Sequence, residues 1–166
     1  DRVIVLTVED SITNTVLEFF GESKAVLTAQ QENEGIKPSA FDNKNFGFRI
    51  GQGAALAVFE SERSIERLGV SPKAMMLGSY SASEASTNAI GQLEDGSGYV
   101  KAMHGAMLQA KIVQSDIGIV KSHGTGTLSN NNAEKNALTK NLTNFVATSY
   151  KQKIGHTMGA SGLLET

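Results

Sequence analysis

His-Gly-Thr-Gly-Thr at residues 123–127 and Gly-His-Thr-Met-Gly-Ala-Ser-Gly at residues 155–162 are the most informative motifs of this chain. Each follows a short apolar run, at 116–121 and 145–150 respectively. Short runs of this composition predict buried parallel strands. The pattern therefore predicts that each histidine lies where a strand ends.

The two histidines are predicted to lie close together. Open α/β sheets gather their chemistry at the carboxyl ends of strands, so we expect His123 and His156 in one pocket. Lys151 precedes His156 by five residues and could reach the same place. A lone histidine is more often structural, and we interpret His104 in this way because no motif surrounds it. The shared glycine framing favours a catalytic role for the other two.

The rest of the chain alternates between strand-like and helix-like segments, which predicts an α/β fold with a largely parallel sheet. The apolar spacing of the last predicted helix, at Val100, Met103, Met107 and Leu108, is typical of a helix packed on a sheet. We expect a buried strand at 2–8 and further strands at 54–60 and 74–81. We also expect helices at 12–20, 61–68 and 99–111, and loops at 28–46 and 83–98.

Composition disfavours several classes of function. The chain has 166 residues, 40% of them hydrophobic, which is compatible with one compact domain or with a piece of a larger one. A formal net charge of −2 gives no global attraction for nucleic acid. No run approaches membrane-spanning length, so no membrane partner is predicted. Because the chain has no cysteine, it can form neither a disulfide framework nor a thiolate metal site.

Several segments together carry a family resemblance. They are Phe-Asp at 41–42, Gly-Phe-Arg-Ile-Gly-Gln-Gly-Ala at 47–54, the 123–127 motif with Glu134 after it, and Ser-Tyr-Lys-Gln-Lys-Ile-Gly-His-Thr-Met-Gly-Ala-Ser-Gly at 149–162. In this order, the segments resemble the middle and C-terminal part of a β-ketoacyl synthase. The resemblance implies the thiolase-like fold, an α/β fold with layered α/β/α/β/α architecture and largely parallel mixed sheets, incomplete in this chain. It also implies that 1–68 finish the first half of that fold and that 73–166 begin the second.

The resemblance implies an acyltransferase of fatty-acid or polyketide synthesis. Such enzymes carry out a decarboxylative Claisen condensation of an acyl thioester with malonyl-acyl carrier protein. Their nucleophile is a cysteine, which we expect upstream of Asp1, so we interpret the chain as a fragment that is inactive alone. A cytoplasmic setting and a homodimer or ketosynthase heterodimer are also implied. The alternative is a non-catalytic partner subunit resembling a chain-length factor, but such partners usually lose the histidines that this chain retains.

The resemblance also implies catalytic roles. We expect His123 and His156 to donate N–H groups to the enolate oxygen, because a neutral imidazole offers a donor without needing a counter-ion. Lys151 is expected to stay cationic and to hold the hydrogen-bond network in register, with Glu134 as its charge partner. Glu134 could instead be a surface acid. No metal is expected, because the two histidines lack the local i, i+4 pairing of helical zinc sites.

A second group of residues is expected to bind the carrier of the substrate. Thr125 and Thr127 match positions whose hydroxyls bind the phosphopantetheine arm of acyl carrier protein, and with substrates carried in this way we expect no separate cofactor. Carrier proteins are acidic, so we expect a basic docking patch, for which Lys37 and Lys44 are the candidates. An equally good interpretation is that both are ordinary solvated lysines.

Residues 51–55 lack the third glycine of a dinucleotide fingerprint, so nucleotide binding is not predicted.

Four positions depart from the family pattern. Asn45 and Phe46 stand where many members carry an arginine and an acidic residue, Gln52 replaces a glutamate, and Asn131 replaces an aspartate. The loss of charges in one neighbourhood predicts a coordinated rewiring of a buried polar network. The pattern favours a divergent branch, such as polyketide or polyene assembly, and the acyl preference does not follow from it.

Overall fold

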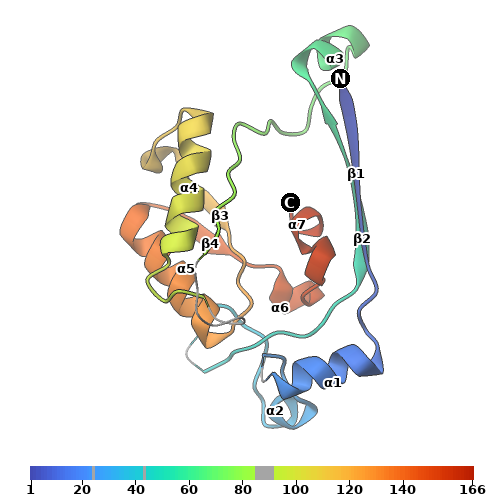
Figure 1. Cartoon of the computed structure of the whole chain (residues 1–166), viewed down its shortest axis with the longest axis vertical. Coiled ribbons are helices and arrows are strands. Elements are labelled where there is room, and N and C mark those ends of the chain that lie inside the picture. Colours follow the sequence, from blue (N-terminus) through green and yellow to red (C-terminus); the bar gives the residue numbers. More distant parts are fainter. Residues whose placement is uncertain (24, 43, 85–91) are drawn as a thin grey trace.

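The C-terminal part of the chain lies between two outer parts. The computed structural model describes residues 1–23, 25–42, 44–84 and 92–166. One outer part is a ribbon of β1 (Arg2–Glu9) and β2 (Gly53–Glu60), and the other contains α4 (Ser97–Ala110) and α5 (Leu128–Asn141). Between them lie α6 (Lys151–Ile154) and α7 (Ser161–Leu164), as Figure 1 shows.

The β1–β2 ribbon contains two of the predicted strands. They pair in antiparallel register, from Arg2 opposite Glu60 to Glu9 opposite Gly53. Successive side chains point to opposite faces of a strand. One face packs against α7 and the short 3₁₀-helix η2 (Met158–Ala160). The other face is apolar and exposed, so the prediction that β1 is a buried strand is wrong for Ile4, Leu6 and Val8.

Short helices connect these strands. The predicted helix at 12–20 forms as α1 (Asn14–Glu22), which begins where the Thr13 side chain accepts a hydrogen bond from the backbone N–H of Val16. The segment predicted as an irregular loop, 28–46, contains α2 (Ala29–Asn33), which a capping box between Thr28 and Gln31 stabilises. The predicted helix at 61–68 forms as α3 (Glu62–Leu68) and ends at Gly69 with a φ of 62°.

The predicted strand at 74–81 does not form. Met75, Met76 and Leu77 are exposed, and the segment pairs with no other strand of the described residues. Gly78 instead lies against α4, where an added Cβ atom would be 2.5 Å from the carbonyl oxygen of Ala106. An apolar run without a strand beside it cannot form a hydrogen-bonded ladder, whatever its propensity.

The predicted helix at 99–111 forms as α4, which begins two residues earlier, at Ser97. Its apolar stripe is only partly covered, because Met107 is buried whereas Leu108 is 82% exposed. The predicted loop at 83–98 lies partly outside the described residues, since 85–91 are not among them. After α4, the short 3₁₀-helix η1 (Gln114–Asp116) leads into the second sheet.

The second sheet presents the first histidine motif. Its strands β3 (Ile119–Lys121) and β4 (Val146–Thr148) are parallel, as predicted, although both are shorter than the predicted runs. His123 follows β3 by two residues, so it lies at a carboxyl strand end. The helix α5 follows the motif and packs on α4, and it supplies much of the small buried core through Ala133, Ala137 and Leu138.

His156 is positioned differently from the prediction. It does not follow β4 directly, because α6 lies between them. Instead, its backbone N–H donates to the carbonyl oxygen of Arg49 at 2.7 Å, and its carbonyl oxygen accepts from the N–H of Gly51 at 3.0 Å. The two segments approach so closely that a Cβ atom on Gly155 would lie 2.9 Å from the Cα atom of Gly51. Backbone pairing across more than a hundred residues thus places His156.

No helix in the described ranges is both long and apolar enough to cross a membrane. The expected division of the chain into two halves, 1–68 and 73–166, stays a prediction.

The close approach at Gly51 gives a first testable prediction. In Gly51→Ala, the new Cβ atom would lie 2.5 Å from the carbonyl oxygen of Ile154, so one segment must move. We expect a loss of about 1–3 kcal/mol in the free energy of unfolding of the intact protein, measured by chemical denaturation. Gly118→Ala is the matched control, because nothing lies within 4 Å of its Cβ position. Equal effects of the two substitutions would contradict this role of Gly51.

Candidate active site

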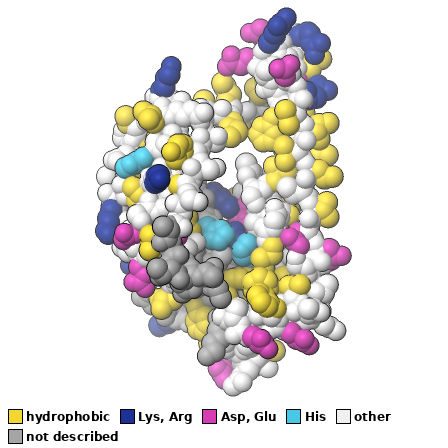
Figure 2. Space-filling model, viewed as in Figure 1, with side chains coloured by type: hydrophobic (Ala, Val, Ile, Leu, Met, Phe, Trp, Pro, Cys, Tyr) yellow, Lys and Arg dark blue, Asp and Glu magenta, His cyan; other side chains and the backbone are white. Residues whose placement is uncertain are grey.

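The structure brings His123 and His156 together. Their ring centroids lie 5.4 Å apart with an interplanar angle of 82°, an edge-to-face arrangement. Figure 2 shows two histidine side chains next to each other near the middle of the visible face. The buried ring of Phe48 also lies against His156, with centroids 5.0 Å apart. Two segments that lie far apart in the sequence therefore supply one pair of imidazoles.

Hydrogen bonds fix the tautomer of His156. Its Nδ1 atom accepts from the backbone N–H of Met158 at 3.2 Å and lies 3.0 Å from Ser161 Oγ. Because a backbone N–H can only donate, Nδ1 of the neutral ring carries no proton, and the proton is on Nε2. The Ser161 hydroxyl then donates to Nδ1 and can accept from Thr157 Oγ1, 3.1 Å away. His156 is thereby held as an Nε2–H donor.

Glu134 fixes the backbone of the first motif. This buried residue of α5 accepts the N–H of His123 on Oε1 at 2.6 Å and the N–H of Gly124 on Oε2 at 2.7 Å. It therefore has the internal position expected for it, but its hydrogen-bond partners are backbone groups and not Lys151. Among the residues that the structure describes, no three His, Asp or Glu side chains gather as metal ligands would.

The hydrogen-bond partner of Lys151 is Glu165. This buried carboxylate accepts from Lys151 Nζ on Oε1 at 2.6 Å and pairs through Oε2 with Lys121 Nζ. Burial alone would raise the pKa of Glu165, but hydrogen bonds from the two lysines outweigh it and hold the pKa below its usual value. Burial lowers the pKa of Lys151, and Glu165 opposes that shift without cancelling it. Two ammonium groups around one carboxylate leave one net positive charge.

This environment favours neutral imidazoles. Burial, the largest cause, lowers the pKa of His123 to about 4 and that of His156 to about 4. The positive charge of Lys151 contributes to both of these shifts, while the negative charge of Glu165 partly opposes them. Both rings are therefore uncharged near pH 7, so each can donate one N–H without acting as a strong acid.

The two threonines of the first motif lie beside a pocket. Thr125 is buried, and its hydroxyl lies 3.2 Å from that of Thr127. Thr127 and Gly126 line a pocket of about 420 Å3 together with the aromatic rings of Phe41 and Phe46. Gly126 has a φ of 76°, and an added Cβ atom there would lie 2.2 Å from the carbonyl oxygen of Ser39. Both ends of the 39–47 loop, Ser39 and Gly47, therefore lie directly against this turn.

One candidate docking lysine, Lys37, precedes this loop, and the other, Lys44, belongs to it. Lys37 and Lys44 are both exposed. Side-chain and backbone hydrogen bonds from Asn45 and Lys44 hold the pKa of Asp42 below its usual value, and the charge of Lys44 contributes. Asp42 thus offsets part of the positive charge at this end of the pocket. Asn45 connects the two ends of the loop, because its Oδ1 accepts from the N–H of Lys37 at 2.9 Å.

The predicted rewiring of a buried network is not what the structure contains. Asn131 does connect the loop to the first motif, since its Oδ1 accepts from the N–H of Phe41 at 3.2 Å and its Nδ2 donates to the carbonyl oxygen of Gly126 at 3.5 Å. However, it is only half-buried, and Gln52 and Phe46 are exposed. None of the four residues that differ from the family pattern is therefore buried, and they do not form one buried network.

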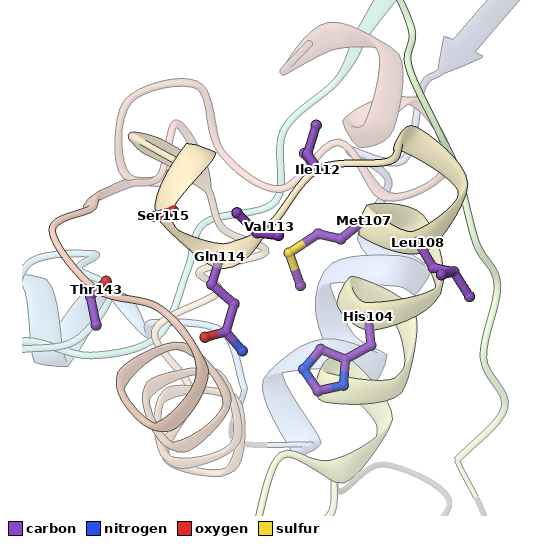
Figure 3. Close-up of a pocket in the computed structure, with 8 residues that line it drawn as sticks. All are labelled: His104, Met107, Leu108, Ile112, Val113, Gln114, Ser115 and Thr143. Atoms are coloured by element: carbon purple, nitrogen blue, oxygen red, sulfur yellow. The ribbon is translucent and has the colours of Figure 1, made fainter.

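A second hollow lies away from the paired histidines. His104, Met107, Leu108 and Val113 line it, and Figure 3 shows the His104 side chain projecting from α4 at its edge. His104 is exposed and makes no contact with the two site histidines. Its position agrees with the interpretation that it is not part of the site.

Three residues of the site were not predicted from the sequence. Glu165 follows the second motif without any recognisable pattern, and Ser161 is one of several serines and threonines there. Lys121 had a weak signal, because it is a charge at the end of an otherwise apolar run. A charged residue in such a place needs a partner, and the structure supplies Glu165.

Comparisons with known proteins agree with the fold and the motifs. Residues 73–166 match the family model described as "Beta-ketoacyl synthase, C-terminal domain". The chain is 27% identical over 168 residues to 3-oxoacyl-[acyl-carrier-protein] synthase 2 of Rhizobium meliloti, and 29% identical over 171 residues to the protein of the same name from Vibrio cholerae. These alignments cover 99% of this chain but only 40% and 41% of the relatives. The chain thus spans about two fifths of their length.

Solved structures give the same result. A β-ketoacyl synthase from Burkholderia phymatum matches with a TM-score of 0.87 and 26% identity, over 99% of this chain and 39% of the other. The ishigamide ketosynthase/chain length factor matches with a TM-score of 0.78 and 25% identity, over 98% and 38%. A type II polyketide acyl carrier protein in complex with its ketosynthase matches with a TM-score of 0.88 and 22% identity, over 98% and 41%. The predicted thiolase-like fold is confirmed.

The low pKa values of the histidines can be measured directly. We expect NMR titration of labelled histidine in the intact protein to give midpoints near pH 4 for His123 and His156, well below the ordinary histidine pKa of 6.5. Since the folded protein binds these protons more weakly than the unfolded chain, its stability should fall as the pH drops from about 6.5 towards 4. Midpoints at or above 6.5 for both rings would contradict the buried, neutral pair.

Proposed function

This chain belongs to the β-ketoacyl synthase family, and on that premise we propose that it supplies the paired histidines of a condensing enzyme. The reaction joins an acyl thioester to malonyl-acyl carrier protein with loss of carbon dioxide, in fatty-acid or polyketide synthesis. The observation that carries the proposal is the pair of neutral imidazoles, His123 and His156, held edge to face at a centroid distance of 5.4 Å.

The proposed chemistry has three steps. A cysteine thiolate, which we place upstream of Asp1, first attacks the carbonyl carbon of an acyl thioester, so that a new thioester forms and the thiolate of the donor leaves. The malonyl thioester then loses carbon dioxide, and the electron pair of the broken C–C bond forms an enolate. Finally the enolate carbon attacks the acyl thioester carbonyl, a new C–C bond forms, and the cysteine thiolate leaves. The enolate is the difficult species, because its oxygen carries developing negative charge.

The histidines suit the stabilisation of that oxygen. The Nε2–H of His156 is fixed by the hydrogen bonds that its Nδ1 atom accepts. A preorganised donor of this kind contributes about 2.7–4 kcal/mol in known oxyanion holes. A neutral ring also has an advantage over an imidazolium, which could protonate the carbanion before it attacks. Burial and the positive charge of Lys151 both favour the neutral form.

Two further residues support the pair in this proposal. Lys151 stays cationic beside Glu165 and organises the buried end of the site. Glu134 holds the N–H groups of His123 and Gly124, so it fixes the turn from which His123 projects. Neither needs to touch the substrate to act in this way.

The substrates in this proposal arrive on the phosphopantetheine arm of an acyl carrier protein, so no separate cofactor is invoked. Thr127 lines the 420 Å3 pocket, and its hydroxyl lies next to that of Thr125, which fits a role in binding the amides of the arm. The exposed Lys37 and Lys44 would bind the acidic carrier by charge complementarity. One structural neighbour is a ketosynthase in complex with its acyl carrier protein.

A second candidate function is that of a non-catalytic partner subunit. The match to the ishigamide ketosynthase/chain length factor is the observation that favours this second candidate, because the name of that structure includes a chain length factor. The residue immediately before Asp1 in the full-length product discriminates the two. A cysteine at a strand-to-helix elbow supports the enzyme, and another residue there supports the partner. The retained histidine pair favours the enzyme.

The proposed function predicts a separation of partial reactions. In the full-length protein, His123→Ala and His156→Ala should each lower malonyl decarboxylation by about 10²–10³-fold or more, because each removes an enolate donor. Transfer of an acyl group to the cysteine should be at least partly retained, since backbone N–H groups are expected to hold that oxyanion. Release of labelled carbon dioxide and acylation of the protein measure the two steps.

His104→Ala is the matched control for this experiment. His104 lies on α4, outside the pair, so both partial reactions should be unchanged. Variants of the pair that lost acyl transfer but retained decarboxylation would overturn the enolate role.

The docking role of the lysines gives a further prediction. Lys37→Glu with Lys44→Glu should slow association with the carrier by about tenfold or more at low salt, with less effect at high salt. Condensation from small soluble thioesters should be nearly unchanged, because they need no docking. Lys101→Glu, at an exposed lysine of α4, is the control. Equal losses with carrier-bound and free substrates would show that the lysines support the fold instead.

A further inference from the structure

Lys121 occupies a fixed position beside the paired histidines. It is the last residue of β3 and pairs in register with Thr148 of β4. The next residue, Ser122, bonds the carbonyl oxygen of Thr148 through both its N–H and its hydroxyl, at 2.9 Å each. In extended chain, residues two apart point to the same side, so Lys121 and His123 share one side of this segment.

Glu165 connects Lys121 to the second histidine motif. Its backbone N–H donates to the carbonyl oxygen of Ser161 at 3.0 Å, and the Ser161 side chain lies 3.0 Å from Nδ1 of His156. The short helix α7 thus contains the serine that orients His156 and leads directly into the carboxylate that binds both lysines. Any movement of Glu165 would be transmitted to that serine.

We propose that Lys121 is a positioning residue for the histidine pair: it holds one oxygen of Glu165, so that the other oxygen fixes Lys151, and it keeps a net positive charge beside the two imidazoles. The inference deepens the proposed function and rests on it. In the part of the chain that the structure describes, Lys121 makes no hydrogen bond to either imidazole and pairs with Glu165, so it positions the site through that carboxylate.

The charged groups around the pair come from four elements. They are Lys121 from β3, Lys151 from α6, Glu165 after α7, and Glu134 from α5, whose oxygens are occupied by two backbone N–H groups. Lys121 and Lys151 each lower the pKa of both imidazoles, and Glu165 raises it. Without Lys121, one ammonium and one carboxylate would cancel, so the rings would bind protons more readily.

Protonation would damage the site in a specific way. A proton on Nδ1 of His156 would face the backbone N–H of Met158, which lies 3.2 Å away and is itself a donor. The hydrogen bond that orients the ring would be lost. The resulting imidazolium would also be an acid able to protonate the enolate. The positive charge of Lys121 thus protects both the orientation and the chemical state of the ring.

The test compares four substitutions in the full-length protein. Lys121→Met removes the charge and the hydrogen bond, Lys121→Gln keeps a hydrogen-bond donor without the charge, and Lys121→Arg keeps both. Lys153→Met removes a nearby exposed lysine of α6 that does not contact Glu165, and it serves as the matched control. The readouts are the NMR titration midpoints of His123 and His156 and the acid limb of malonyl decarboxylation against pH.

We expect Lys121→Met and Lys121→Gln to raise both midpoints by about 0.5 pH unit or more, and to move the acid limb by a similar amount. Lys121→Arg and Lys153→Met should stay close to the unsubstituted protein. If Lys121→Met fails to fold, Lys121→Gln and Lys121→Arg decide the matter.

Midpoints of Lys121→Gln that coincide with those of the unsubstituted protein would overturn the inference. So would a shift of Lys121→Arg as large as that of Lys121→Gln, because charge would then not be the cause. The NMR readout needs no turnover. If the protein proved inactive while the midpoints still moved, the proposed function would fail and the positioning role of Lys121 would stand.

Discussion

The close backbone contact between Gly51 and Gly155 is the constraint on which the site depends. It allows the segment around Arg49 to pair with His156, so a residue near the C-terminal end of the chain is held by one from its first third. The same approach brings the ring of Phe48 against the imidazole of His156. A side chain at either glycine would separate these segments, because the distances leave no room for a Cβ atom. The distance between the two histidines follows from this pairing.

Electrostatics then decide what the two histidines can do. Burial disfavours the charged imidazole, and a net positive cluster of Lys121, Lys151 and Glu165 acts in the same direction. The two effects reinforce each other, and together they hold both imidazoles in the neutral state. Both carboxylate oxygens of Glu134 accept hydrogen bonds from backbone N–H groups, and neither is bonded to an imidazole. The site is therefore built to offer uncharged N–H donors, which is what a developing enolate oxygen requires.

The sequence predicted those features that local pattern determines. The strands β1 and β2 and the helices α3 and α4 have clear periodicity and end signals, and they formed close to the predicted bounds. The segment 74–81 has strand-like composition, but strand formation depends on a neighbouring strand, which sequence alone does not supply. The turn of helix between β4 and His156 was missed because only five residues separate Lys151 from the histidine, too few for a helical period to appear.

The partner of Lys151 could not be predicted for a related reason. Glu134 and Glu165 are both acidic residues near a motif, and only the tertiary arrangement shows which carboxylate meets which donor. The histidine pair itself was predictable because glycine-rich frames and preceding apolar runs mark it in the sequence. The histidines and Lys151, which lie within motifs, were thus identified, whereas two other charged residues that act on the imidazoles were not. Lys121 and Glu165 belong to that second group.

The most direct test of the central claim is the protonation state of the two rings at neutral pH. Long-range nitrogen–proton NMR spectra of the histidine side chains in the intact protein report which ring nitrogen carries the proton. A neutral ring protonated on Nε2 is expected for His156, because Nδ1 accepts from Met158, and a neutral ring is expected for His123. An imidazolium at either position, or a proton on Nδ1 of His156, would contradict a pair of neutral donors.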